Sequence, residues 1–520
     1  MKKKVNEEKN VFIDRIINWL ESKLERILKI KWIYYILLIL IILAVNYINL
    51  KNNPNFLTNK NALNYFIIGC SIATVIAILL LFLNNKLRNK SIPFRFLIIG
   101  LILGTGYTFA SPMFTQSDES FHFIRAYQIA NGNLISPKDD FGNSYDSFPK
   151  SIYETLWDDD DIYPEFKNYE DSYKESKIKL EKNRTVVKDV RASNYIFLNY
   201  FSHAIGMKIG AVFNLSPYLI GLLGRLTNMI ICLLLIYFSL KILPIGKKTM
   251  SVFLLAPSVL AYIASLSADG LIIAMSFLMI SIIIKFMHDK TQFTWKWYVA
   301  LLIIIAFVST CKTTYLPMIG IVLFIPYQCF KSKKNKWIST LSLIILGVIF
   351  SISWINVGSV VISTSKYSGM YEYERFLEIF INTLSKDFLS YIENIFAGNY
   401  LYQCQVNPYQ IVPISYLILT VSSFLSEESD LNVRTIEKIF VSCIILVIVV
   451  LISYALYMGN TDVTSNFING IQGRYFAPIV LFIPFFIKNS KFKINDEILY
   501  DISVILNFAL LVNMVEVFVI

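Results

Sequence analysis

Long apolar runs recur along almost the whole chain, and they constrain the fold more than any other feature of the sequence. Roughly twelve or thirteen of them are long enough to cross a hydrocarbon core of about 30 Å. A mean hydropathy of +0.54 and a charged fraction of 16% place the chain outside the range of soluble proteins of this size. Because lipid offers no hydrogen-bonding partner to an open backbone, each run is expected to be helical. The sequence predicts an all-α, polytopic integral membrane protein.

Basic residues explain both the net charge of +11 and the expected topology. They gather in alternate short connectors, as the positive-inside rule expects of cytoplasmic loops, so no nucleic-acid partner is needed to account for the charge. The intervening connectors are nearly free of Lys and Arg and are expected outside. This pattern predicts a multi-pass protein of the cell membrane with a cytoplasmic N-terminus. The basic connectors are residues 86–95, 241–248, 285–296, 331–336 and 488–493.

The chain divides into a short N-terminal segment and one long membrane domain. Residues 1–30 carry an apolar stripe at helical spacing and no cleavage site, so they predict an amphipathic segment on the cytoplasmic surface. Residues 31–520 form the membrane domain, with two long extracytoplasmic loops at 112–193 and 357–408. Both loops are expected to hold interfacial helices. Residues 194–215 contain polar interruptions and favour a re-entrant or surface-lying helix over a full span.

Two further features bear on disulfides and metals. The six cysteines have no paired spacing and mostly lie inside apolar runs, so they indicate neither a disulfide framework nor a metal site. Four consecutive aspartates at residues 158–161 are oxygen donors of the kind that Mg²⁺ or Mn²⁺ prefers. A solvated acidic surface explains the same run, so a divalent cation stays an alternative.

The first candidate for chemistry is the stretch that follows the outward-running segment 94–110. Asp118 and Glu119 lie a few residues beyond it, and on a helix His122 and Arg125 share a face with them. A carboxylate at the membrane boundary is placed to take a proton from an acceptor hydroxyl. Asp118 is the candidate base, and Glu119 its partner or a substrate-positioning group. His122 either acts directly or only orients the carboxylates.

Four ionisable residues lie within or at the outer ends of apolar segments: Arg225, Asp269, Lys312 and Arg474. Such residues cost about 2.5 to 3.5 kcal/mol at mid-bilayer, so they usually face a cavity or one another. The expected topology brings the last three near the leaflet of Asp118, where cations suit a departing phosphate. Snorkelling to the interface is the alternative. Gly473 is expected to let the backbone approach a ligand closely.

These motifs resemble a known family. The pattern P-x-x-x-x-x-D-E-x-x-H-x-x-R-A-Y-x-I-A-x-G-x-L, which begins at Pro112 and ends at Leu134, resembles the first-loop motif of a bacterial family of predicted multi-spanning membrane proteins of uncharacterised function. The stretches G-R-L-x-N from Gly224, S-x-D from Ser267, K-x-x-Y from Lys312 and Q-G-R-Y-F-x-P through Arg474 and Tyr475 follow the same order.

That family is in turn similar to the GT-C superfamily of membrane glycosyltransferases. The resemblance implies a polyprenyl-phosphate-linked sugar donor, an extracytoplasmic acceptor glycan or cell-envelope polymer, and a catalytic acid in the first outer loop. It adds His122, Arg125 and Tyr475 to the substrate-binding candidates. The sequence thus predicts a glycosyltransferase that inverts the anomeric centre, in contact with membrane lipids. A flippase or transporter of lipid-linked sugars, and a polysaccharide polymerase or ligase, are the alternatives.

Overall fold

A computed structural model of the chain describes residues 30–57, 59, 61–140, 144–156, 168–181, 183–188, 191–358, 373–397, 411–462, 464–488 and 492–519. The amphipathic segment predicted at the N-terminus and the aspartates at 158–161 lie outside these residues. Residues 359–372 and 398–408 of the second predicted outer loop also lie outside them.

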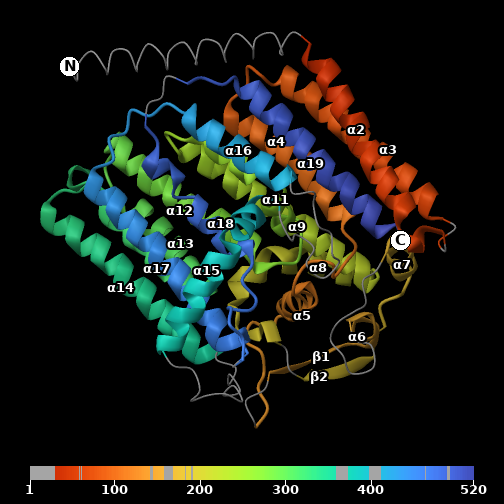
Figure 1. Ribbon diagram of the computed structural model, residues 1–520. Coiled ribbons are helices and arrows are strands. Elements are labelled where there is room, and N and C mark those ends of the chain that lie inside the picture. Colours follow the sequence, from red (N-terminus) through yellow and green to blue (C-terminus); the bar gives the residue numbers. More distant parts are fainter. Residues whose placement is uncertain are drawn as a thin grey trace.

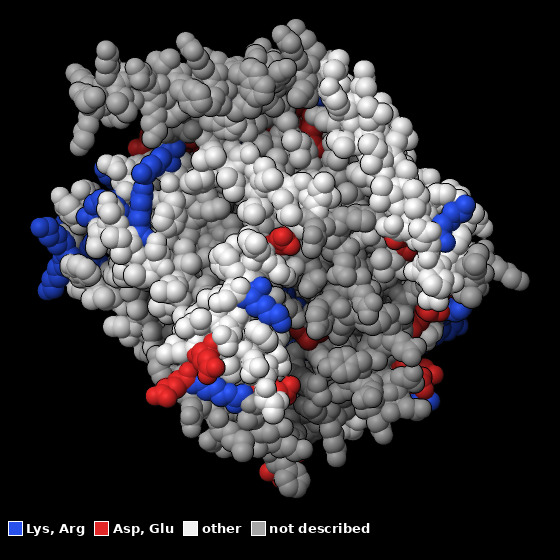
Figure 2. Space-filling model, viewed as in Figure 1, with Lys and Arg blue, Asp and Glu red and all other residues white. Residues whose placement is uncertain are grey.

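Eight helices in the described ranges are long and apolar enough to cross a membrane, which confirms the all-α polytopic class. Their outward surfaces carry few charges, and Figure 2 shows wide uncharged areas between the Lys, Arg, Asp and Glu side chains. The eight are α2 (Lys31–Asn52), α3 (Ala62–Lys86), α4 (Ile92–Ala110), α9 (Pro217–Ile242), α12 (Ala268–Asp289), α14 (Lys333–Gly358), α17 (Thr435–Asn460) and α19 (Asp496–Phe518).

Other apolar segments are shorter or broken by proline. Pro257, Pro478 and Pro484 each stand in the first turn of a short helix, and Pro317 lies inside η4. Proline lacks the amide proton that would continue a preceding helix, so these segments kink. The segments that are shorter or contain proline are α10 (Lys247–Leu254), α11 (Pro257–Ile263), α13 (Trp295–Cys311), η4 (Thr313–Phe324), η5 (Tyr327–Cys329), α16 (Ile411–Leu425), η7 (Gly473–Phe476), α18 (Ala477–Val480) and η8 (Ile483–Phe486).

Helices α2, α3, α4 and α19 lie side by side on one flank (Figure 1). A buried polar network joins all four. The Asp501 carboxylate on α19 accepts hydrogen bonds from Tyr35 of α2 at 2.9 Å and from Asn84 of α3 at 2.8 Å, and Arg95 of α4 donates to Asn84 at 2.7 Å. Burying any of these polar groups without a partner costs free energy, so the network favours this arrangement of neighbouring helices.

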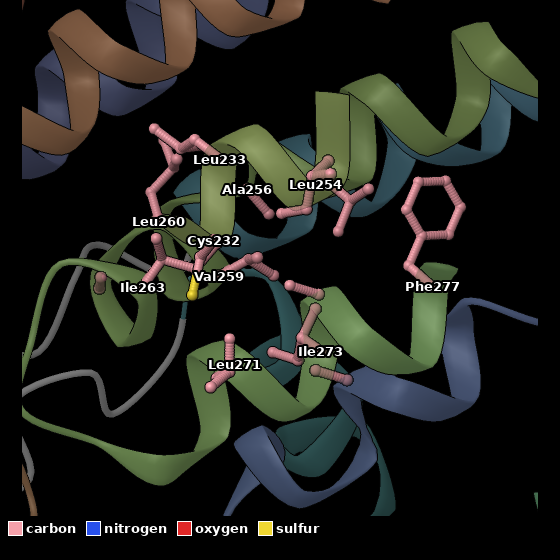
Figure 3. Close-up of a cluster of buried hydrophobic side chains, with 14 of the residues drawn as sticks. Cys232, Leu233, Leu254, Ala256, Val259, Leu260, Ile263, Leu271, Ile273 and Phe277 are labelled. Carbon is pink, nitrogen blue, oxygen red and sulfur yellow. The ribbon is translucent and has the colours of Figure 1, made fainter. Parts of the chain in front are cut away.

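The centre of the molecule is an apolar core formed by α9, α11 and α12 (Figure 3). Leu233 of α9, Leu260 of α11 and Ile273 of α12 have no exposed surface. Helix α12 is buried nearly all round, as expected for a membrane helix whose neighbours surround it. It therefore gives a fixed position to the residues at its N-terminal end.

Residues 112–193, predicted as the first outer loop, contain the only strands in the described part of the chain. β1 (Tyr145–Pro149) and β2 (Arg184–Lys188) pair antiparallel, with Tyr145 opposite Lys188. From the sequence, only helices were expected in this loop. The loop also holds α5 (Glu119–Ala130), α6 (Lys150–Leu156) and α7 (Tyr169–Glu175), which gather on one side of the bundle in Figure 1.

Residues 194–215, expected to be re-entrant or surface-lying, form two short turns and one helix. η2 (Arg191–Asn194) and η3 (Phe197–Tyr200) precede α8 (Phe201–Val212), which at 12 residues is too short to cross a bilayer. Helix α8 packs along α9, and Gly206 allows it because a Cβ there would lie 2.2 Å from the carbonyl oxygen of Leu223. η3 is thereby placed beside α5.

Candidate active site

The structure brings Asp118 and Arg474 into contact although 355 residues separate them in sequence. The Arg474 guanidinium donates a hydrogen bond from Nη2 to Asp118 Oδ2 at 2.6 Å, and from Nη1 to the carbonyl oxygen of Ser117 at 3.3 Å. The Asp118 side chain is 47% exposed, whereas that of Arg474 is 3% exposed. The acid is therefore the accessible member of the pair, and the cation lies behind it.

A strained turn sets the direction of Asp118. Phe114 and Asp118 have φ angles of +67° and +62°, and neither is glycine. Left-handed backbone at such residues costs on the order of 1–3 kcal/mol and is common at functional sites. Asp118 is consequently the N-cap of α5 and not part of the helix. The expected common helical face fails for this reason, and the two adjacent carboxylates have different partners.

Glu119 forms a fully buried ion pair with Arg225 of α9. Arg225 donates from Nε and Nη2 to the two Glu119 oxygens at 2.7 and 2.6 Å, and the amides of Phe114 and Leu266 donate to the same oxygens at 2.8 and 2.9 Å. Arg225 also donates to the carbonyl oxygen of Pro112 at 3.0 Å. Neither side chain has any exposed surface. In this structure both side chains hold the turn between α4 and α5.

Asp269 and Lys312 complete the charged cluster around Arg474. Asp269 lies in the first turn of α12, and its carboxylate oxygens are 3.5 Å from Arg474 Nε and 3.8 Å from Lys312 Nζ. Lys312 occupies the connector between α13 and η4. Arg474 thus has a carboxylate on each side and a second cation nearby. From the sequence, Asp269, Lys312 and Arg474 were expected to lie near Asp118. In the structure the four side chains lie together.

Tyrosine rings surround the cations. The Lys312 ammonium lies 3.9 Å from the ring centroid of Tyr475, and the Arg474 guanidinium lies 5.1 Å from the same ring and 6.0 Å from that of Tyr262. The hydroxyl of Tyr315 donates to the carbonyl oxygen of Tyr475 at 2.8 Å. Cation–π contacts of this kind hold cations in place without neutralising them. The rings therefore hold both cations beside the two carboxylates of the cluster.

His122 and Arg125, both predicted to bind substrate, have partners within the protein. His122 Nδ1 lies 2.6 Å from the hydroxyl of Tyr200, and its ring meets Tyr195 edge to face. Arg125 is fully buried and donates to the carbonyl oxygen of Leu134 at 2.7 Å. His122 borders the charged cluster, whereas Arg125 fixes the chain after α5.

Burial and charge set the protonation of the two groups at the start of α5. Burial alone raises the pKa of the Asp118 carboxyl, but the charge and hydrogen bond of Arg474 more than offset this and bring the pKa below its ordinary value. Asp118 is thus a carboxylate at neutral pH. Burial dominates at His122 and lowers the pKa of its imidazole, against the opposing effect of Asp118, so His122 is neutral there.

Gly473 was expected to approach a ligand, and instead it approaches helix α15 (Tyr373–Phe396). A Cβ on Gly473 would lie 2.4 Å from the carbonyl carbon of Asn394 and 2.6 Å from its oxygen. The glycine is needed because two backbones meet there. This contact fixes the position of Arg474, the next residue.

Several site residues were not predicted from the sequence. Tyr195 lies before η3, Tyr200 ends η3 and Tyr262 belongs to α11. Ser117 supplies a carbonyl oxygen to Arg474. The signal for the first two was the polar interruption of the apolar run at 194–215. Tyr262 gave no signal, because an aromatic residue in an apolar run is ordinary.

The described residues contain no group of three or more His, Cys, Asp and Glu side chains arranged to hold a metal ion. The five cysteines that the structure describes are free thiols. The two carboxylates of the site both contact Arg474, so their charge is offset within the protein.

Fold and site together define a polytopic, all-α membrane protein with a charged cluster at one end of its helical bundle. The family described as "Predicted membrane protein (DUF2142)" matches residues 101–483, from α4 to η8, and the chain belongs to this family. That range contains every residue of the candidate site. Comparison with the curated proteins and with the solved structures gives no match.

Proposed function

We propose that the protein is a membrane glycosyltransferase of the GT-C type. It would move a sugar from a polyprenyl-phosphate donor to an acceptor glycan or cell-envelope polymer outside the cytoplasm. The observation that carries the proposal is the contact between the half-exposed Asp118 carboxylate and the buried Arg474, with Lys312 beside it. Such a site offers a base and a phosphate-binding cation within one hydrogen bond of each other.

In the proposed reaction Asp118 accepts the proton of an acceptor hydroxyl. The hydroxyl oxygen forms a bond to the anomeric carbon as the bond from that carbon to the phosphate oxygen breaks. The polyprenyl phosphate leaves with the bonding electron pair, and Arg474 and Lys312 stabilise its charge. A single in-line displacement inverts the anomeric centre.

The ion pair also suggests how the donor prepares the base. A phosphate that binds Arg474 competes with Asp118 for the guanidinium, whose Nη2 is only 2.6 Å from the carboxylate. When Asp118 loses this hydrogen bond, its pKa is expected to rise, because Arg474 no longer stabilises the carboxylate. Asp118 then becomes a stronger base. Donor binding before acceptor activation is the order that this geometry favours.

The proposed extracytoplasmic position rests on charge. Helix α4 starts beside the basic connector 86–95 and ends at Ala110, directly before the turn that carries Asp118. The positive-inside rule then puts that turn outside. Lipid-linked sugars are the donors that reach an outer surface.

The test compares four strains of the native host: a deletion, and the deletion complemented with wild type, Asp118→Asn or Asp140→Asn. Asp140 is an exposed acid of the same loop and serves as the matched control. The measurements are the sugar composition of the envelope, the pool of lipid-linked sugars and the amount of protein in the membrane. General-base catalysis supplies typically about 10²–10⁴-fold in rate, so Asp118→Asn is expected to match the deletion.

The expected result is the loss of one sugar substituent and accumulation of its lipid-linked donor, with Asp140→Asn like wild type. If Asp118→Asn decorates the envelope normally, Asp118 is not the base. If the lipid-linked sugar accumulates only on the cytoplasmic face, the flippase alternative replaces the transferase. If the accumulated donor is an oligosaccharide on pyrophosphate, the protein is a polymerase or ligase.

A further inference from the structure

An apolar groove begins beside the candidate site. It has a volume of about 440 Å³ and lies between α15, α16, α17 and the segment 476–486. Among the described residues that line it, no polar atom is exposed in the groove. Phe388 of α15 and Val421 of α16, which line it, are 55% and 45% exposed. Aromatic and aliphatic surface of this extent in the wall of a groove indicates a ligand with a long apolar part.

One end of the groove lies next to the close approach of α15 and η7, near the start of the segment that carries Arg474. One wall, α15, touches the opposite wall through the backbone contact of Asn394 with Gly473. Arg474 is the next residue, and Phe476, two residues further on, already lines the groove. The polar end of a ligand in the groove would therefore lie against Arg474.

The direction of the groove follows the chain from Phe476 to Phe486. These ten helical steps rise about 15 to 20 Å in total, roughly half of a hydrocarbon core of about 30 Å. Helix α15 contributes residues at helical spacing along one face, including Leu384, Phe388 and Ile395. This arrangement suits a ligand with an anionic head near Arg474 and a single apolar chain along the groove.

We infer that the groove between α15, α16, α17 and residues 476–486 binds the prenyl chain of the lipid-linked donor, whose phosphate lies against Arg474. This inference rests on the proposed function, since it identifies the donor by its carrier. The groove favours a prenyl chain over a two-chain phospholipid because it is one channel, and the residue that begins one of its walls, Phe476, is two positions from Arg474. An ordinary membrane lipid is the competing occupant in the test.

The test uses the full chain in phosphatidylcholine nanodiscs and a sugar-free polyprenyl monophosphate with a diazirine on its prenyl chain. After photolysis, mass spectrometry locates the labelled peptides. We expect labels in α15, α16, α17 or residues 476–486. Labels confined to other helices would overturn the inference, whether or not any variant folds.

A matched pair of variants on α16 tests the groove directly. Val421→Trp fills it, whereas Ile418→Trp adds the same ring to an exposed residue of that helix outside the lining. We expect Val421→Trp to reduce labelling about tenfold and Ile418→Trp to leave it unchanged. Equal labelling of both variants would contradict binding of the prenyl chain in the groove. The same conclusion would follow if excess phosphatidylglycerol displaced the probe as well as unlabelled polyprenyl phosphate does.

The two proposals fail separately. Labelling in the groove together with a normal envelope in the Asp118→Asn strain keeps a prenyl-lipid site and removes the transferase. Loss of the sugar in that strain without labelling in the groove keeps the transferase and removes the groove as the donor site.

Discussion

Glu119 and Arg225 are both fully buried, and each satisfies the other. Removing one partner of a buried pair leaves an uncompensated charge and typically costs about 3–5 kcal/mol. We therefore expect Glu119→Ala to lower the thermal unfolding temperature of the detergent-solubilised protein markedly. The control is Glu170→Ala, which removes an exposed partner of Lys174 and is expected to change little.

The double variant Glu119→Ala with Arg225→Met sharpens this prediction. It removes both charges, so it is expected to recover part of the lost stability. An unchanged unfolding temperature for Glu119→Ala alone would show that the pair does not hold the turn.

At the scale of residues, the sequence predicted which charges meet but not how they divide. Asp269, Lys312 and Arg474 interrupt apolar segments, and the cost of burying them alone makes their convergence predictable. The separate roles of Asp118 and Glu119 depend on the positive φ of Asp118. The residue types of this turn do not predict that angle, because non-glycine residues rarely adopt a positive φ.

At the scale of elements, the contact between η7 and α15 depends on one missing methyl group. A Cβ at Gly473 would lie 2.4 Å from the backbone of Asn394, which cannot rotate away as a side chain does. We expect Gly473→Ala to shift η7, to lower stability and to reduce activity by displacing Arg474. Unfolding temperature and the envelope sugar measurement report the two effects.

Gly459→Ala is the control for this change, because a Cβ at Gly459 in α17 meets nothing within 4 Å. It is expected to match wild type in both measurements. Equal behaviour of the two alanine variants would mean that the close approach of η7 and α15 is not required.

Long helices were predictable as elements, and short ones were not. The apolar runs of α3 and α17 predict helices without an alternative, since a continuous apolar segment of that length must be helical in lipid. The strands β1 and β2 lie in a polar loop, where the sequence YDSFP of β1 shows no clear alternation. Their pairing depends on a partner about forty residues away, which local patterns do not specify.

At the scale of the whole molecule, the charged site lies where α12 begins and α13 ends, at one end of an otherwise apolar bundle. Only the direction of the chain through the membrane decides which compartment that end faces. The basic connectors make this direction predictable, because their alternation is a property of the whole chain and not of any one helix.

Single cysteines introduced at two exposed positions test the direction. We expect Asp140→Cys, in the first predicted outer loop, to react in intact cells with a membrane-impermeant maleimide. Lys334→Cys, in the first turn of α14, is expected to react only after permeabilisation. The unsubstituted chain gives the background from its own cysteines. The opposite result would put Asp118 in the cytoplasm, where soluble nucleotide sugars are available. A polyprenyl carrier would then have no purpose, and both the proposed donor and its groove would have to be abandoned.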